Sequence, residues 1–174
     1  MIIRKKYRFE AAHIVRDCSS KMCKENIHGH SYIVEVFISG KHLDHGCMIL
    51  DFSKLAKVKE LINSFDHSYC MWDKESASVK KAMQSINRRT VTMPISPSAE
   101  GFALMFFVMI RALLSELSYD NGEGEVKLHS VRVHETESGY AEAFEEDLAM
   151  AHFTPKEVIF SEGIKEEWHL LGQH

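Results

Sequence analysis

Residues 2–13 read IIRKKYRFEAAH, and apolar and charged side chains alternate along this stretch. One parity is mainly apolar and ends in a histidine; it includes Ile3, Tyr7, Phe9, Ala11 and His13. The other parity includes Arg4, Lys6, Arg8 and Glu10. Because successive side chains of a strand point to opposite faces, the pattern predicts a β-strand with one covered face. The terminal histidine lies on that covered side.

A second strand is predicted for residues 28–40, which read HGHSYIVEVFISG. One parity holds the two histidines and most of the apolar residues, namely His28, His30, Tyr32, Val34, Val36 and Ile38. Glu35 and Phe37 have the opposite parity, so this strand is expected to be partly buried on both faces. Residues two apart on a strand point the same way, which places the two imidazoles side by side with little bulk from Gly29 between them.

Two helices and two further strands are predicted beyond residue 48. Residues 49–67 place apolar side chains three and four apart after the capping residue Asp51, and this helix should end near Asp66 and His67. Residues 96–117 predict a buried helix, with Ser96 as its cap and Pro97 at its first position. Residues 125–136 and 139–147 predict two strands joined by a short turn.

This order of elements predicts an α+β protein, in which an antiparallel sheet carries its helices on one face. Residues 70–95 are charged and weakly periodic, and they are expected to form an excursion with some helix. A C-terminal extension is expected after residue 148. Because so small a sheet leaves exposed edges that other subunits can pair with, we expect an oligomer.

The composition is that of a globular domain rather than a disordered or membrane-spanning chain. The chain has 174 residues, of which 45% are hydrophobic, and its formal net charge is −4. No run approaches the ~20 apolar residues of a membrane span, and the scattered basic residues give no nucleic-acid footprint. Four dispersed cysteines without a secretory signal favour free thiols in the cytoplasm.

The histidines predict a metal site. If the two N-terminal strands pair, the imidazoles of His13, His28 and His30 converge. Three protein ligands with an open fourth position are the arrangement of catalytic zinc. Cys23 is close enough in sequence to be a fourth ligand, which would instead give a closed structural site.

Two acidic residues are further candidates. Asp66 next to His67 can orient an imidazole as in catalytic relays, or the pair can be a solvated helix end where the dipole favours histidine. Glu135 has the same strand parity as the apolar residues Val131 and Val133. It therefore either binds a donor-rich heterocycle through two hydrogen bonds or lies in water beyond the end of the strand.

Six motifs, in this order, resemble the family of 6-pyruvoyltetrahydropterin and 6-carboxytetrahydropterin synthases. They cover residues from about 2 to about 147. The motifs are FEAAH at 9–13, HGHSY at 28–32, ILDFSKL at 49–55, FDHSY at 65–69, SPSAE at 96–100 and VHET at 133–136.

The resemblance implies a fold, a cofactor and a substrate. It implies the tunnelling fold, a four-stranded antiparallel sheet with two helices on one side, in which three subunits close a barrel and two barrels stack into a hexamer with active sites between subunits. The usual substrate is 7,8-dihydroneopterin triphosphate. The matched residues are His13, His28 and His30 as Zn²⁺ ligands, Glu135 and Thr136 as the pterin anchor, and Asp66 and His67 as a relay pair. The implied synthase domain is residues 1–147, with an insertion at about 70–95 and an extension at 148–174.

The chain departs from the family pattern at the residue expected to take a proton. Cys23 gives C-x-x-x-x-H-G-H, whereas the carboxy-forming enzymes have three residues between cysteine and histidine and the pyruvoyl-forming enzymes have five. Glu25 gives E-x-x-H-G-H, which resembles a branch that forms 6-hydroxymethyldihydropterin for folate. Both residues are therefore candidate bases.

The favoured function is a zinc-dependent lyase that forms 6-carboxy-5,6,7,8-tetrahydropterin, a precursor of queuosine and other deazapurines, with loss of acetaldehyde and triphosphate. The alternatives are the hydroxymethyl-forming enzyme that uses Glu25, and the pyruvoyl-forming enzyme. A non-enzymatic alternative is a zinc-stabilised oligomeric binding protein with Cys23 as fourth ligand.

Overall fold

The computed structural model describes residues 1–150 and 152–171, so position 151 and positions 172–174 of the expected C-terminal extension lie outside the described residues. The strands are β1 (Ile2–His13), β2 (His28–Ser39), β3 (Ser68–Trp72), β4 (Thr90–Met93), β5 (Lys127–His134), β6 (Tyr140–Ala143) and β7 (Ile159–Phe160). The α-helices are α1 (Lys21–Glu25), α2 (Ala56–Asn63), α3 (Ala77–Ile86), α4 (Ala99–Ser115) and α5 (Glu162–Leu171). Short 3₁₀ helices cover Phe52–Leu55, Glu145–Met150 and Pro155–Glu157.

The described strands form one mixed sheet in the order β6-β5-β2-β1-β3-β4-β7. The α+β class is confirmed, and β1, β2, β5 and β6 are antiparallel as expected. The expected four-stranded sheet is wrong, because the described residues form seven strands, with β3 parallel to both β1 and β4. The residues of β4 and most of β3 are buried, so these short strands lack the alternation that marks a half-covered strand.

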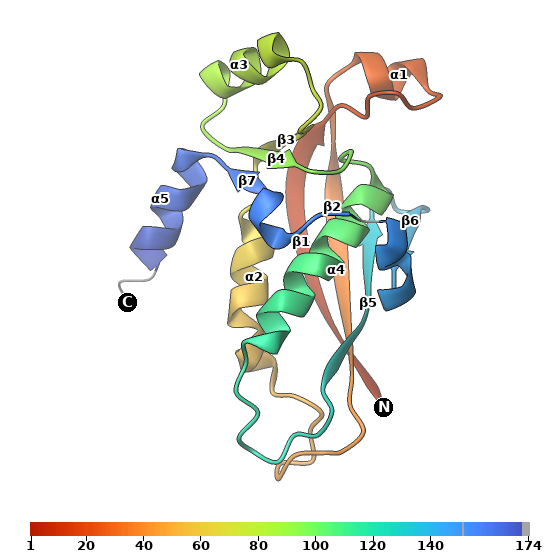
Figure 1. The fold of residues 1–174 in the computed structure, drawn as a ribbon, viewed down its shortest axis with the longest axis vertical. Coiled ribbons are helices and arrows are strands. Elements are labelled where there is room, and N and C mark those ends of the chain that lie inside the picture. The colour runs from red at the N-terminus through yellow and green to blue at the C-terminus, as the bar shows by residue number, and fades with distance from the viewer. Residues whose placement is uncertain (151, 172–174) are drawn as a thin grey trace.

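Helices α2 and α4 cover one face of the sheet, while α1 and α3 both lie at one end of the molecule (Figure 1). The predicted cap of the first helical region is confirmed, since the Asp51 side chain accepts a hydrogen bond from the Ser53 amide. Beneath α2 and α4 lies an aromatic core that contains Phe9, Tyr32, Phe65, Phe102 and Phe106. The rings of Phe9 and Tyr32 stack with centroids 4.7 Å apart, which joins β1 to β2.

Helix α4 begins two residues later than the sequence predicts. Ser98, rather than Ser96, is the N-cap, and its hydroxyl accepts a hydrogen bond from the Gly101 amide. Pro97 therefore lies outside the helix, where its carbonyl oxygen is free for another donor. The helix is buried nearly all round, as expected.

The opposite face of the sheet carries a charged cluster, the Glu35 network. Glu35 is only 4% exposed. Its Oε1 lies 2.6 Å from Nη1 of Arg4, and its Oε2 lies 2.9 Å from Nε2 of His134 and 3.6 Å from Nη1 of Arg132. The network explains how β2 buries a carboxylate on its second face.

The described part of the C-terminal extension continues the same sheet. Strand β7 pairs with β4, and α5 then packs beside α2 through Trp168, whose indole N–H donates to Oγ of Ser64 at 2.7 Å. No helix within the described ranges has both the length and the apolar character that a membrane span needs.

Candidate active site

Three histidines meet where β1 ends and β2 begins. In the antiparallel register His13 lies opposite His28, and Ala11 lies opposite His30. The ring centroids are 4.4 Å apart for His13 and His28, 5.2 Å for His13 and His30, and 5.3 Å for His28 and His30. One nitrogen from each ring lies within 4.8 Å of the others. The expected pairing of the two strands therefore brings all three imidazoles together.

Two of the three rings are oriented by hydrogen bonds to backbone carbonyl oxygens. Nδ1 of His13 lies 2.6 Å from the Pro97 carbonyl oxygen, and Nδ1 of His28 lies 3.1 Å from that of Asn26. A carbonyl oxygen only accepts, so each Nδ1 carries a proton, which leaves Nε2 as the nitrogen that can bind a metal. Burial lowers the pKa of His13 to about 4, although the bond to Pro97 acts in the opposite direction. At neutral pH this ring is uncharged, which is the form that binds metal.

The cluster fits a zinc ion. Nε2 of His30 is buried and has no hydrogen-bond partner among the described residues, and one nitrogen of each of the three rings lies within 4.8 Å of the others. Buried polar atoms of this kind are rare without a ligand. Three imidazole nitrogens are also a donor set that zinc prefers.

Glu135 faces the same cluster from the end of β5. Its Oε1 lies 3.7 Å from Nε2 of His13 and 3.8 Å from Nε2 of His30, and its side chain is 30% exposed. The carboxylate is therefore neither buried nor free in water. It stands between the histidines and the solvent, where it can meet a bound molecule.

An open cavity of about 550 Å³ adjoins the histidines. Its lining includes Cys23, His28, His30, Glu100, Glu135 and Thr136. The cavity thus combines a thiol, imidazoles and carboxylates. Its volume is in the range of small-molecule sites.

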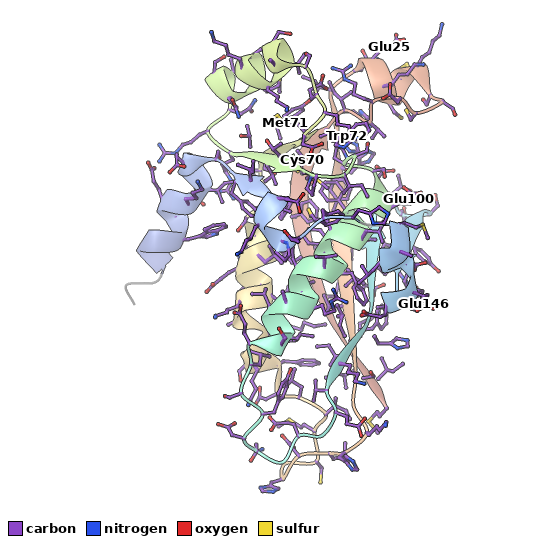
Figure 2. All side chains as sticks on the ribbon, in the orientation of Figure 1. Glu25, Cys70, Met71, Trp72, Glu100 and Glu146 are labelled. Atoms are coloured by element: carbon purple, nitrogen blue, oxygen red, sulfur yellow. The ribbon has the colours of Figure 1, made fainter. Side chains whose placement is uncertain are left out.

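Glu25 is not among the residues that line this cavity. It is the last residue of α1 and is exposed, at the outer end of the molecule (Figure 2). Glu100, in contrast, lies in the first turn of α4 beside the sheet (Figure 2). Of the two candidate bases, only Cys23 lies at the cavity.

Asp66 and His67 dock on the backbone of β1 at Glu10. Oδ2 of Asp66 lies 2.9 Å from Nδ1 of His67, and Oδ1 accepts a hydrogen bond from the Glu10 amide at 2.8 Å. The His67 amide donates to the Glu10 carbonyl at 2.7 Å, and φ of His67 is 55°. Burial alone would raise the pKa of Asp66, but the hydrogen bonds from Glu10 and His67 lower it overall. This pair is docked on β1 rather than being a loose helix end.

His67 lines a second cavity, of about 640 Å³, together with Glu10 and Ser31. These two residues have the strand parity opposite to that of Ala11 and His13. Ala11 and His30 also line this second cavity, whereas Cys23 lines only the first. Within one chain His67 therefore does not share a cavity with Cys23.

Sequence reasoning missed several contributors to the site. The Pro97 carbonyl holds His13, and the Tyr32 hydroxyl lies 3.2 Å from the same ring. Glu100 and Cys18 line the cavity beside Cys23. Tyr32 shares the parity of the two histidines of β2, and that was a usable signal, whereas a backbone carbonyl has no signature in the sequence.

Comparisons with known proteins match this chain to tetrahydropterin synthases. The family model of 6-pyruvoyl tetrahydropterin synthase matches residues 2–146. A 6-carboxy-5,6,7,8-tetrahydropterin synthase of Helicobacter pylori J99 is 45% identical over 97% of this chain and 87% of its own length. The enzyme of that name from Haemophilus influenzae is 27% identical over 80% of this chain and 96% of its own.

Three solved structures have the same fold. An uncharacterized protein of Wolinella succinogenes matches with a TM-score of 0.66 and 19% identity, covering 83% of this chain and 98% of that one. The 6-pyruvoyl tetrahydropterin synthase of Caenorhabditis elegans matches with a TM-score of 0.56 and 21% identity, covering 83% of this chain and 94% of that one. A variant of the 6-pyruvoyltetrahydropterin synthase of Plasmodium vivax, altered at a catalytic glutamate, matches with a TM-score of 0.54 and 18% identity. The match covers 82% of this chain and 97% of that one.

Proposed function

Because the chain belongs to the 6-pyruvoyl tetrahydropterin synthase family, we propose that it is a zinc-dependent lyase that makes 6-carboxy-5,6,7,8-tetrahydropterin from 7,8-dihydroneopterin triphosphate. Family membership makes it a pterin-converting enzyme. The observation that carries the proposal is the single cavity shared by Cys23, His28, His30 and Glu135. The name carried by the curated relatives supports the carboxylated product, a precursor of queuosine and other deazapurines.

The proposed reaction needs no external oxidant or reductant. The bond between the side chain and triphosphate breaks as a proton leaves the neighbouring carbon. Two hydrogens pass from the side-chain carbon next to the ring, and from its hydroxyl, to the pterin, which becomes the tetrahydro form. Water then completes cleavage between the first two side-chain carbons. Its hydroxyl ends on the carboxyl carbon and its hydrogen on acetaldehyde.

Each residue at the cavity has a proposed role. Cys23, as the thiolate, takes protons from the side-chain carbons, because it lies at the cavity beside the histidines. Glu135 and Thr136 hold the pterin, whose adjacent N–H groups match a carboxylate. When bound to His13, His28 and His30, zinc would supply Lewis acidity toward the substrate hydroxyls.

We further propose that Asp66 and His67 serve a site in a neighbouring subunit. Within one chain His67 and Cys23 line different cavities, so the relay and the base do not meet in one cavity. A homohexamer built as a dimer of trimers, with sites between subunits, would solve this geometry. Location in the cytoplasm is also proposed, in keeping with the four free cysteines of the described residues.

The alternative product is 6-hydroxymethyldihydropterin, formed with Glu25 as base. It is favoured by the E-x-x-H-G-H spacing, and a Plasmodium vivax relative also has a catalytic glutamate. Against it stands the exposure of Glu25 outside the cavity.

Product identification tests the proposed function. The zinc-loaded protein is incubated with 7,8-dihydroneopterin triphosphate, and the pterins are separated and identified by mass spectrometry. Acetaldehyde, triphosphate and carboxytetrahydropterin in equal amounts support the proposal. Hydroxymethyldihydropterin, a pyruvoyl product, or zinc binding without any turnover would each overturn it.

Mixed oligomers test the shared site. Cys23→Ala and Asp66→Asn chains are co-expressed with different tags, and oligomers that carry both tags are purified. If each site takes its thiol from one chain and its carboxylate from a neighbour, random mixing restores about a quarter of the sites. Mixed oligomers that stay as inactive as either variant alone would contradict a site shared between copies.

A further inference from the structure

The segment that carries Cys23 has little to hold it in place. Helix α1 has five residues, none of them buried, and its N-cap Ser20 makes no side-chain capping bond. A helix this short is not stable on its own in water. Its position over the cavity must therefore come from contacts with the rest of the chain.

Two hydrogen bonds tie the segment down. The Val15 amide donates to the Cys23 carbonyl at 3.1 Å. Nη1 of Arg16 donates to the Lys24 carbonyl at 2.8 Å. The two bonds hold the backbone carbonyl groups of Cys23 and Lys24. Because Lys24 directly follows Cys23, the position of Arg16 helps to fix the position of the thiol.

Arg16 is in turn fixed by the excursion of residues 70–95. Its Nε lies 2.7 Å from Oε2 of Glu75, whose side chain is only 9% exposed. Oε1 of Glu75 accepts a hydrogen bond from the Ser76 amide at 2.9 Å, next to the start of α3. Both oxygens of this carboxylate are therefore committed, and a partly buried pair of this geometry is worth more than an exposed one.

The excursion is itself anchored to the end of β1. A separate small core joins them and consists of Ile14, Tyr69, Met71 and Met83. The labelled positions of Met71 and Trp72 show how β3 runs beneath α3 and toward α1 (Figure 2). Glu75 thus belongs to a packed unit and can serve as a fixed support for Arg16.

We propose that Arg16 and Glu75 are positioning residues, through which the excursion of residues 70–95 holds the Cys23 segment at the cavity. The inference rests on the proposed function in so far as Cys23 is the base. The excursion then has a definite role, because Glu75 orients the guanidinium and the guanidinium orients the Lys24 carbonyl.

Two variants test the proposal in the full-length, zinc-loaded protein. Glu75→Gln removes the charge that orients Arg16. Arg16→Lys keeps a positive charge for Glu75, but its single ammonium lacks the planar fork that reaches both Glu75 and the Lys24 carbonyl. Arg88→Lys is the matched control, because Arg88 pairs with Glu166 on the surface away from α1.

The first readout is the alkylation rate of Cys23 by iodoacetamide, followed by peptide mass spectrometry with the exposed Cys47 as internal reference. Both test variants should label Cys23 about threefold faster or more, because the segment opens more often. Labelling of Cys47 should not change. The second readout is turnover: kcat should fall about tenfold with KM unchanged, since the base is misplaced while the substrate still binds.

The outcomes separate this proposal from the proposed function. Wild-type labelling and wild-type kcat in both test variants would overturn it, as would equal changes in Arg88→Lys. If Cys23→Ala stays fully active, the assignment of the base fails, whereas faster labelling in Arg16→Lys would still establish the support of the segment. The melting temperature of each variant shows whether it is folded. If either Glu75→Gln or Arg16→Lys does not fold, the other variant alone provides the test.

Discussion

Replacing Cys23 by alanine should abolish most of the turnover without unfolding the protein. A positioned general base contributes about 10²- to 10⁴-fold, which is about 3 to 5 kcal/mol in the barrier. Cys23 is only partly buried and lies on a helix with no buried residue, so its truncation should change stability by about 0.5 kcal/mol or less. Glu25→Ala should keep kcat within about twofold, because this side chain is exposed and does not line the cavity.

The assay measures triphosphate and acetaldehyde release under steady state, with kcat and KM determined separately. The melting temperature and the zinc content of each variant are measured in parallel. Cys47→Ser is the matched control, since Cys47 is an exposed thiol that does not line the cavity. Full activity in Cys23→Ala together with inactivity in Glu25→Ala would refute the reasoning and favour the hydroxymethyl-forming alternative.

Three further variants probe the site and its support. In Gly29→Ala the new Cβ would lie 2.9 Å from the Ala11 carbonyl oxygen, so the strands must separate beside the histidines; we expect a loss of about 1–3 kcal/mol in stability and lower zinc content. Glu35→Gln should cost about 2–3 kcal/mol in denaturant unfolding, because it leaves the cations of the Glu35 network without their partner. Glu135→Gln should raise KM about tenfold, the effect of one charged hydrogen bond, with a smaller change in kcat.

The pH dependence of the Glu35 variant has a definite sign. Burial alone would raise the pKa of Glu35, but the hydrogen bond from His134 and the charges of Arg4 and Arg132 lower it overall. Its stabilisation is therefore present above the unfolded pKa of about 4.3 and is lost as the pH falls through the lower folded value. The stability difference between Glu35→Gln and wild type should shrink below about pH 4. A constant difference would show that the carboxylate charge is not what stabilises the network.

The other two predictions also have outcomes that would contradict them. Unchanged zinc content in Gly29→Ala would mean that the close approach of the strands is not needed for the cluster. An unchanged KM in Glu135→Gln would remove this residue from pterin binding. Ser39→Ala is a suitable control on the same strand as Gly29, because Ser39 lies at the other end of β2 from the histidines and lines neither cavity.

The meeting of the histidines could be predicted because it depends on strand parity alone. His13 lies on the covered side of β1, and His28 and His30 share a side of β2. Once the strands pair, a period of two places all three on one face. The amphipathic stripe of the first helical region could also be predicted from its spacing. Leu55, Val58, Ile62 and Phe65 are buried as expected, but Phe52, the first residue of the predicted stripe, is exposed.

The remaining parts of the site depend on contacts that leave no local pattern. The Pro97 carbonyl reaches His13 across 84 positions of the chain. Asp66 and His67 were placed correctly next to a helix end, but their docking on the Glu10 backbone depends on how β1 lies in the sheet. Such contacts use peptide groups, which every residue has, and so the sequence alone cannot distinguish them.

The choice between Cys23 and Glu25 follows from the helix that they share. An α-helix turns by about 100° per residue, so side chains two positions apart point about 200° apart. With Cys23 turned toward the cavity, Glu25 must face outward, and the two environments agree with this. A loop in place of α1 would allow both to turn inward. For Glu25 to act, α1 would have to rotate or unwind and break the bond from Arg16 to Lys24, so the contacts that position the thiol also keep the carboxylate out.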